Sequence, residues 1–154
     1  MQARRHLAHV PSFARYPLVF LTVVSNQRKT LLATQTAFDA LTAIWSRAAE
    51  IDGWFVGDYL IMPDHVHRFA KGSPDATPLA DWVGSWKSLS SRQLKPLLKL
   101  TGALWQPDYF DRFLRTQESY REKWDYVALN PVRKGLCKRP EDWPWKGRLH
   151  EFDR

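Results

Sequence analysis

The stretch "WFVGDYLIMPDHVHRFA" (residues 54–70) is the feature that most limits how this chain can fold. Two runs rich in apolar residues, 54–62 and 65–70, flank the turn pair Pro63-Asp64. Such runs separated by two turn residues predict neighbouring antiparallel strands joined by a hairpin. A tight hairpin is therefore expected near the middle of the chain, with the other elements packed around it.

Further periodic segments lie on both sides of this hairpin. Apolar spacing predicts strands at 16–24 and around 110–114, and helices at 35–50, 79–95 and 117–130. Thr34 or Thr36 is a candidate N-cap of the first helix, and Pro96 is expected to kink or end the second. Pro131 is expected to end the third, because the residue before a proline avoids the α conformation.

The resulting order, β-α-β-β-α-β plus a helix, is that of the ferredoxin-like (split βαβ) fold in the α+β class. It predicts a four-stranded antiparallel sheet with two helices on one face and the C-terminal helix free to cover the other. A length of 154 residues favours one domain. We divide it into a basic arm (1–15), a core (16–130) and a basic, turn-rich tail (131–154).

Charge and cysteine content limit the partners. Lys and Arg number 23 against 16 Asp and Glu, a formal charge of +7. This balance favours a polyanion, with nucleic acid first, although a basic protein without such a partner is the alternative. The single cysteine, Cys137, excludes an intramolecular disulfide and a cysteine-rich zinc site. The chain has no apolar run long enough for a membrane span and no signal-peptide pattern, so we expect a cytoplasmic protein without a membrane partner.

His65 and His67 are two residues apart on a predicted strand, so both project from the same face. Val66 points to the opposite, helix-covered face. Two imidazoles about 7 Å apart along a strand can converge on one divalent ion, but they need a further ligand. The alternative is an ordinary polar strand edge that binds nothing.

The last predicted helix can supply what the histidine pair lacks. Tyr126 and Asn130 lie one turn apart on one side of it, beside the apolar residues Trp124, Val127 and Ala128. If this helix crosses the open face of the sheet, a phenol and an amide oxygen meet the two imidazoles. Taken separately, Tyr126 could be a packed aromatic residue and Asn130 a helix cap before proline.

Four blocks, "MPDHVH", "LWQPDYFDRFLR", "YVALNPVRKGL" and "PEDWPW", occur in this order. With them the chain resembles the REP-associated tyrosine transposases over residues 16 to 146. These belong to the single-tyrosine His-hydrophobe-His (HUH) transposases and nucleases. The resemblance implies an enzyme of the bacterial cytoplasm and nucleoid that acts on single-stranded DNA, with an imperfect palindromic REP-type hairpin as its partner. It is compatible with a monomer or a homodimer.

By position in the family's motifs, the resemblance implies that His65 and His67 bind the metal, with Asn130 as third ligand where related transposases have Gln. Tyr126 matches the nucleophile. The implied reaction is a metal-dependent endonuclease and strand-transfer step through a 5′-phosphotyrosine. Mg or Mn is the expected ion, although zinc would also suit histidine ligands. The sequence names no general base, and Glu122, one turn before Tyr126, is only a candidate.

Clustered cations are candidates for phosphate contacts: Arg4, Arg5, Arg15, Lys87, Arg92, Lys95, Arg133 and Lys134, with Lys138 and Arg139 further along the tail. Two positions depart from the family pattern. Asp64 stands where Asn is commoner, and Arg68 stands where apolar residues usually follow the second histidine. We expect Arg68 to reach toward an edge of the sheet, or the strand to end early.

Three other functions stay open at this point. The chain could be a non-catalytic single-strand binding module built on a sheet. It could be a domesticated nuclease that cuts DNA but no longer mobilises it. A nucleotide hydrolase of the histidine-triad type would need a histidine at position 69, where the chain has Phe69.

Overall fold

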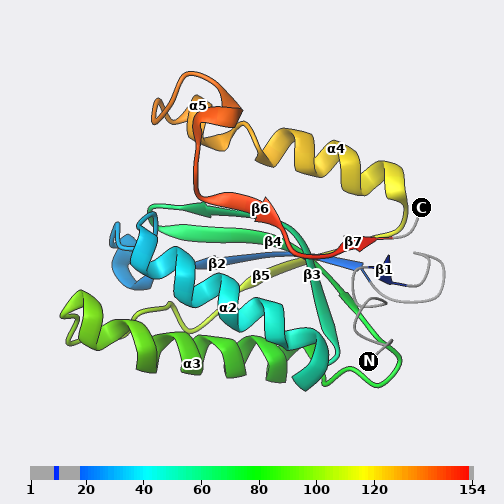
Figure 1. The fold of residues 1–154 in the computed structure, drawn as a ribbon, viewed down its shortest axis with the longest axis horizontal. Coiled ribbons are helices and arrows are strands. Elements are labelled where there is room, and N and C mark those ends of the chain that lie inside the picture. Colours follow the sequence, from blue (N-terminus) through cyan, green and yellow to red (C-terminus); the bar gives the residue numbers. More distant parts are fainter. Residues whose placement is uncertain (1–8, 11–17, 153–154) are drawn as a thin grey trace.

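The computed structural model describes residues 9–10 and 18–152. A twisted antiparallel sheet lies at its centre, with α2 (Gln35–Ile51) and α3 (Leu79–Leu98) on one face and α4 (Gln117–Val127) on the other (Figure 1). The strands are β2 (Leu18–Val24), β3 (Trp54–Met62), β4 (His65–Gly72), β5 (Phe110–Leu114) and β6 (Lys146–Arg148), in the order β5-β2-β4-β3-β6. Without β6, this is the predicted ferredoxin-like order, which is confirmed.

The central hairpin pairs Met62 with His65 across the turn at Pro63-Asp64, as predicted. The prediction of four strands was one short. No strand was predicted in the turn-rich tail, but β6 pairs antiparallel with β3 and extends the sheet. The tail also holds a short 3-10 helix, Pro140–Asp142, and β7 (Glu151–Phe152), which pairs in parallel with β1 (His9–Val10).

Large aromatic side chains fill the layer between the sheet and the two helices, among them Trp45, Trp82 and Trp86. Helix α2 begins at the first of its two candidate caps, since the Thr34 hydroxyl accepts a hydrogen bond from the backbone N–H of Ala37 at 3.2 Å. Helix α3 continues through Pro96 to Leu98, so ending it at residue 95 was wrong.

Arg68 is the clearest departure from expectation on this side of the sheet. Strand β4 continues past it to Gly72, and its side chain is 0% exposed. Its guanidinium lies 4.0 Å from the ring centre of Trp86 and about 5 Å from those of Trp45 and Trp82. Both expectations for this residue, an edge position and an early strand end, were therefore wrong.

The last predicted helix is divided in two. Helix α4 ends at Val127, and α5 (Asn130–Arg133) begins after two intervening residues, with Pro131 in its first turn. A proline in the first turn costs no helical hydrogen bond, because the first N–H groups of a helix have no partner within it. Pro131 therefore starts a helix here instead of ending one, and Tyr126 and Asn130 belong to two successive helices. None of the described helices is long and apolar enough to cross a membrane.

Candidate functional site

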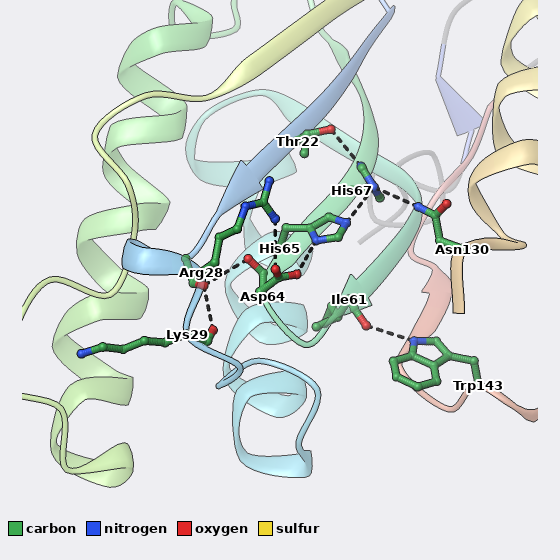
Figure 2. A network of polar contacts seen from close by, with 10 residues as sticks. Thr22, Arg28, Lys29, Ile61, Asp64, His65, His67, Asn130 and Trp143 are labelled. Atoms are coloured by element: carbon green, nitrogen blue, oxygen red, sulfur yellow. Dashed lines mark hydrogen bonds and ion pairs between the residues drawn. The ribbon is translucent and has the colours of Figure 1, made fainter. Parts of the chain in front are cut away.

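The histidine pair lies on the sheet face that α4 covers. Alternation along β4 buries Val66 in the α2/α3 layer and leaves His65 and His67 half-buried on the other face, as predicted. Their two Nε2 atoms are 3.1 Å apart (Figure 2). Two ligand atoms each about 2.1 Å from one ion, at a right angle, would be about 3 Å apart. The spacing of the pair therefore fits a shared divalent ion.

Neighbouring side chains orient both rings. Nδ1 of His65 lies 2.7 Å from Asp64 Oδ1, and Arg28 donates to the other oxygen of this carboxylate at 3.0 Å. An ionised carboxylate only accepts, so His65 carries its proton on Nδ1 and directs a lone pair from Nε2. Nδ1 of His67 contacts the Thr22 hydroxyl at 2.8 Å, and its ring stacks on Phe20 at a centroid distance of 5.3 Å.

The electrostatics keep both imidazoles neutral at neutral pH. Burial lowers the pKa of His67 to about 3, and the neighbouring His65 and Lys123 add to this effect. Burial also lowers the pKa of His65, although Asp64 partly opposes it. Burial alone would raise the pKa of Asp64, but its hydrogen bonds to His65 and Arg28 bring it below the ordinary value. Neutral imidazole is the form that binds a metal.

A third protein ligand for the ion has to be a side chain other than His, Cys, Asp or Glu. Within residues 9–10 and 18–152, no group of three or more His, Cys, Asp or Glu side chains is placed to hold a metal. Asn130 is beside the pair, with its Nδ2 3.2 Å from Nε2 of His67 (Figure 2). Its Oδ1 accepts a hydrogen bond from Arg133. The residues present fit a divalent ion, and Asn130 as third ligand stays a prediction.

Tyr126 lies on the same side of the sheet, near the end of α4, and is 61% exposed. The guanidinium of Arg133 covers its ring at 4.0 Å. An open groove of about 460 Å³ runs between α4 and the edge strand β5, lined by Arg112, Phe113, Leu114, Arg115, Ser119, Glu122, Lys123 and Tyr126. The tyrosine is thus accessible from a groove that carries more cations than carboxylates.

This groove contains residues that the sequence reasoning missed, notably Arg112, Arg115 and Lys123. In the sheet register, Arg112 lies opposite Phe20 and Phe110 opposite Thr22. Phe110 and Arg112 therefore share the face of the histidines, and Phe110 is 65% exposed. The alternation of rings and arginines in "FDRFLR" was the available signal, since both suit a nucleic-acid strand.

The predicted phosphate contacts are scattered. Arg4, Arg5 and Arg15 lie outside the described residues. Lys87, Arg92 and Lys95 belong to α3, which covers the opposite face of the sheet, and Lys87 donates to the backbone carbonyls of Gln106 and Pro107 at 2.7 and 3.1 Å. Arg133 and Lys134 lie at the histidine site, where the charge of Lys134 acts on His65.

Helix α4 is fastened to the sheet by a buried polar cluster. The Tyr120 hydroxyl donates to Oδ2 of Asp58 at 2.6 Å and accepts from the Asp58 backbone N–H at 3.0 Å. Arg148 of β6 donates to the other carboxylate oxygen at 3.1 Å. The register of β3 shifts between Val56 and Tyr59, and a Cβ on Gly57 would lie 2.7 Å from the Tyr120 oxygen. An irregularity and a glycine in β3 thus admit the helix that carries Tyr126.

A histidine pair thus lies on a ferredoxin-like sheet, on the face covered by a helix with an exposed tyrosine, which is the arrangement that the resemblance in the sequence led us to expect. Residues 14–127 match the family model described as "Transposase IS200 like". The chain belongs to this transposase family.

Particular relatives agree with this assignment. The REP-associated tyrosine transposase of Escherichia coli K12 is 29% identical over 133 residues, 82% of this chain and 73% of the relative. The structure of a REP-associated tyrosine transposase bound to a REP hairpin matches with a TM-score of 0.71 at 22% identity, over 84% of this chain and 75% of that one. A crystal structure from Deinococcus radiodurans R1, assigned as a transposase, matches with a TM-score of 0.55 at 21% identity. The match covers 73% of this chain and 88% of that one. The resemblance first seen in the sequence motifs is confirmed.

Proposed function

We propose that this protein is a metal-dependent single-stranded DNA endonuclease and strand transferase that cuts beside REP-type hairpins through a 5′-phosphotyrosine intermediate. The observation that carries the proposal is the neutral, half-buried histidine pair, with its Nε2 atoms 3.1 Å apart on the sheet face covered by the tyrosine helix. Membership of the transposase family supports this reading.

His65, His67 and the amide oxygen of Asn130 would hold the ion. A bound Mg²⁺ or Mn²⁺ would supply Lewis-acid polarisation of the scissile phosphate. The chain's own contribution is to present two oriented imidazoles that need not lose a proton to bind it. Asp64 and Thr22 hold these rings in place through their Nδ1 atoms.

In the proposed reaction, the phenolic oxygen of Tyr126 forms a bond to phosphorus while the bond from phosphorus to the 3′ oxygen breaks. The 3′ oxygen takes up a proton and leaves as a 3′-OH, and the 5′-phosphate stays on the tyrosine. A phenol has an ordinary pKa near 10, so its proton needs an acceptor. Glu122 lines the same groove and is the candidate. The reverse attack by a 3′-OH rejoins strands without ATP, because the phosphodiester energy is conserved.

The proposed substrate follows from the relative bound to a REP hairpin and from the groove beside Tyr126. Arg112, Arg115 and Lys123 would neutralise backbone phosphates of the unpaired strand next to the hairpin, and the exposed ring of Phe110 would stack on a base. The protein would act in the bacterial cytoplasm at the nucleoid, as a monomer or homodimer.

The test uses a labelled single-stranded REP-type hairpin with unpaired flanks, incubated with Mg²⁺ or Mn²⁺. We expect a protein–DNA adduct that survives denaturing electrophoresis. Tyr126→Phe and His67→Ala should abolish the adduct yet bind the DNA, while Tyr109→Phe, a tyrosine outside the groove, should retain it. An adduct that persists in Tyr126→Phe would exclude the assigned nucleophile. DNA binding with no adduct, and no effect of a chelator, would instead establish a non-catalytic binding module.

A further inference from the structure

Arg133 connects two residues of the proposed site. Its Nη2 donates to the backbone carbonyl of Tyr126 at 2.7 Å and also to Oδ1 of Asn130. Its guanidinium lies over the Tyr126 ring at 4.0 Å. Asn130 and Arg133 are three residues apart on α5, so their side chains share one side of that helix. One exposed cation thus holds both the expected nucleophile and the expected third metal ligand.

The hydrogen bond from Arg133 decides whether the oxygen or the NH₂ group of the Asn130 amide faces the histidines. With Oδ1 engaged by Arg133, the amide directs its NH₂ group to Nε2 of His67, at 3.2 Å. An amide binds hard cations through its oxygen, whereas its NH₂ group is a hydrogen-bond donor. The opposite orientation would set the NH₂ group against the guanidinium, placing donor against donor. The oxygen of Asn130 is therefore withheld from the ion-binding position while Arg133 stays in place.

A phosphate is the natural competitor for Arg133. Arginine binds phosphate through two parallel hydrogen bonds in which both partners are charged, whereas the Asn130 amide offers it one neutral oxygen. Arg133 is exposed and covers the ring of Tyr126, the residue that a scissile phosphate must reach. A strand entering the site would therefore offer Arg133 a better acceptor than the Asn130 amide.

We propose that Arg133 is a positioning residue that withholds the Asn130 oxygen from the metal site until a DNA phosphate takes its guanidinium. This proposal rests on the metal and DNA chemistry proposed above. Without DNA, the ion has two imidazole ligands from the protein, and with DNA the amide turns and supplies a third. By linkage, DNA then tightens ion binding and the ion tightens DNA binding by the same factor, about 5- to 150-fold for typical couplings.

The first experiment measures Mn²⁺ affinity without DNA, from the signal of free Mn²⁺ in electron paramagnetic resonance. It compares the unsubstituted protein with Arg133→Met and Lys134→Met. Each substitution removes one positive charge near the histidines. Arg133 bonds to Asn130, whereas in the described part of the chain the Lys134 side chain makes no hydrogen bond to that amide. We expect Arg133→Met to tighten Mn²⁺ binding several-fold more than Lys134→Met. Arg133→Lys, which keeps the charge, should fall between the unsubstituted protein and Arg133→Met.

The second experiment repeats the titration with a REP-type hairpin oligonucleotide. All proteins carry Tyr126→Phe to prevent cleavage, and Mn²⁺ binding by the oligonucleotide alone is subtracted. We expect DNA to raise the Mn²⁺ affinity strongly in the protein that keeps both Arg133 and Lys134, and also in the Lys134→Met variant. The increase should be smaller in the Arg133→Met variant. Circular dichroism melting checks that each variant is folded.

The outcomes separate the two proposals. Equal Mn²⁺ affinities in Arg133→Met and Lys134→Met would overturn the role of Arg133 and leave the proposed function intact. If Mn²⁺ binding is unchanged by His67→Ala and no adduct forms with DNA, the proposed function fails and the role of Arg133 fails with it.

Discussion

Arg68 lies in the middle of the strand that carries both histidines, and its guanidinium packs against three tryptophan rings from α2 and α3. None of its three guanidinium nitrogens has a hydrogen-bond partner in the described structure. Removing a charge from water costs several kcal/mol, whereas a desolvated cation–π contact contributes about 2 kcal/mol. The guanidinium also loses the hydrogen bonds that water would give its three nitrogens, so we expect the tryptophan rings to offset only part of the cost of burying this cation.

Replacing Arg68 with Met should stabilise the fold. Methionine fills a similar volume without a buried charge, so we expect the free energy of unfolding to rise by about 1–4 kcal/mol. Arg68→Lys should lower it, because an ammonium is more strongly hydrated and cannot stack as a plane. Urea denaturation measures both. A loss of stability in Arg68→Met would mean that the rings more than compensate for desolvation.

At the scale of elements, the placement of Tyr126 depends on how α4 is held. The cluster of Tyr120, Asp58 and Arg148 is buried at its centre and joins α4 to β3 and β6. Val127 packs in the core beneath the helix, as the apolar side of the predicted helix indicated. Tyr126, the proposed nucleophile, is thereby tied to the sheet of its own chain.

Tyr120→Phe should loosen this attachment. It removes two hydrogen bonds to Asp58, so we expect a loss of about 1–3 kcal/mol in the free energy of unfolding. A misplaced Tyr126 should also slow adduct formation, by about 10-fold or more, while the Kd for DNA changes little. Tyr59→Phe, a buried tyrosine on the opposite face of the sheet, is the control for the adduct rate. An adduct rate in Tyr120→Phe equal to that of the control would argue against a positioning role for the cluster.

The element order was predictable because each main helix and strand has its own apolar period. The features that the sequence did not predict depend on tertiary contacts. Strand β6 has only three residues, and it is a strand because β3 offers it an edge. The break between α4 and α5 was missed because a proline can end one helix or begin the next. Arg68 was placed wrongly because its three tryptophan neighbours come from two helices distant in sequence.

At the scale of the whole molecule, positive charge is distributed over both layers. The groove cations Arg112 and Arg115 lie between β5 and α4, whereas Arg92 lies on α3 across the sheet. The sequence could not distinguish these positions, because basic residues occur along most of its length and only the register of β5 assigns a face. The histidine pair, by contrast, was predictable from strand alternation alone.

The salt dependence of DNA binding can identify the layer that contacts the strand. Each phosphate contact on a single strand contributes about 0.7 to the slope of log Kd against log salt concentration. Arg112→Gln and Arg115→Gln should each reduce the slope by about that amount, because each removes one such contact. Arg92→Gln should leave it unchanged. Equal reductions from Arg92→Gln would place DNA on the helical layer. Fluorescence anisotropy over a range of salt concentrations measures all three.

The attachment of α4 to its own sheet has a consequence for stoichiometry. Under the proposed chemistry, one copy of the chain offers one tyrosine to one histidine pair, so it can retain one severed 5′ end at a time. Excising a segment of DNA requires two cuts. A single copy would have to release its first end before making the second cut, or two copies would have to act on the same DNA. The number of chains engaged per excision event, more than the chemistry of each cut, would then decide whether such a protein moves DNA or only nicks and reseals it.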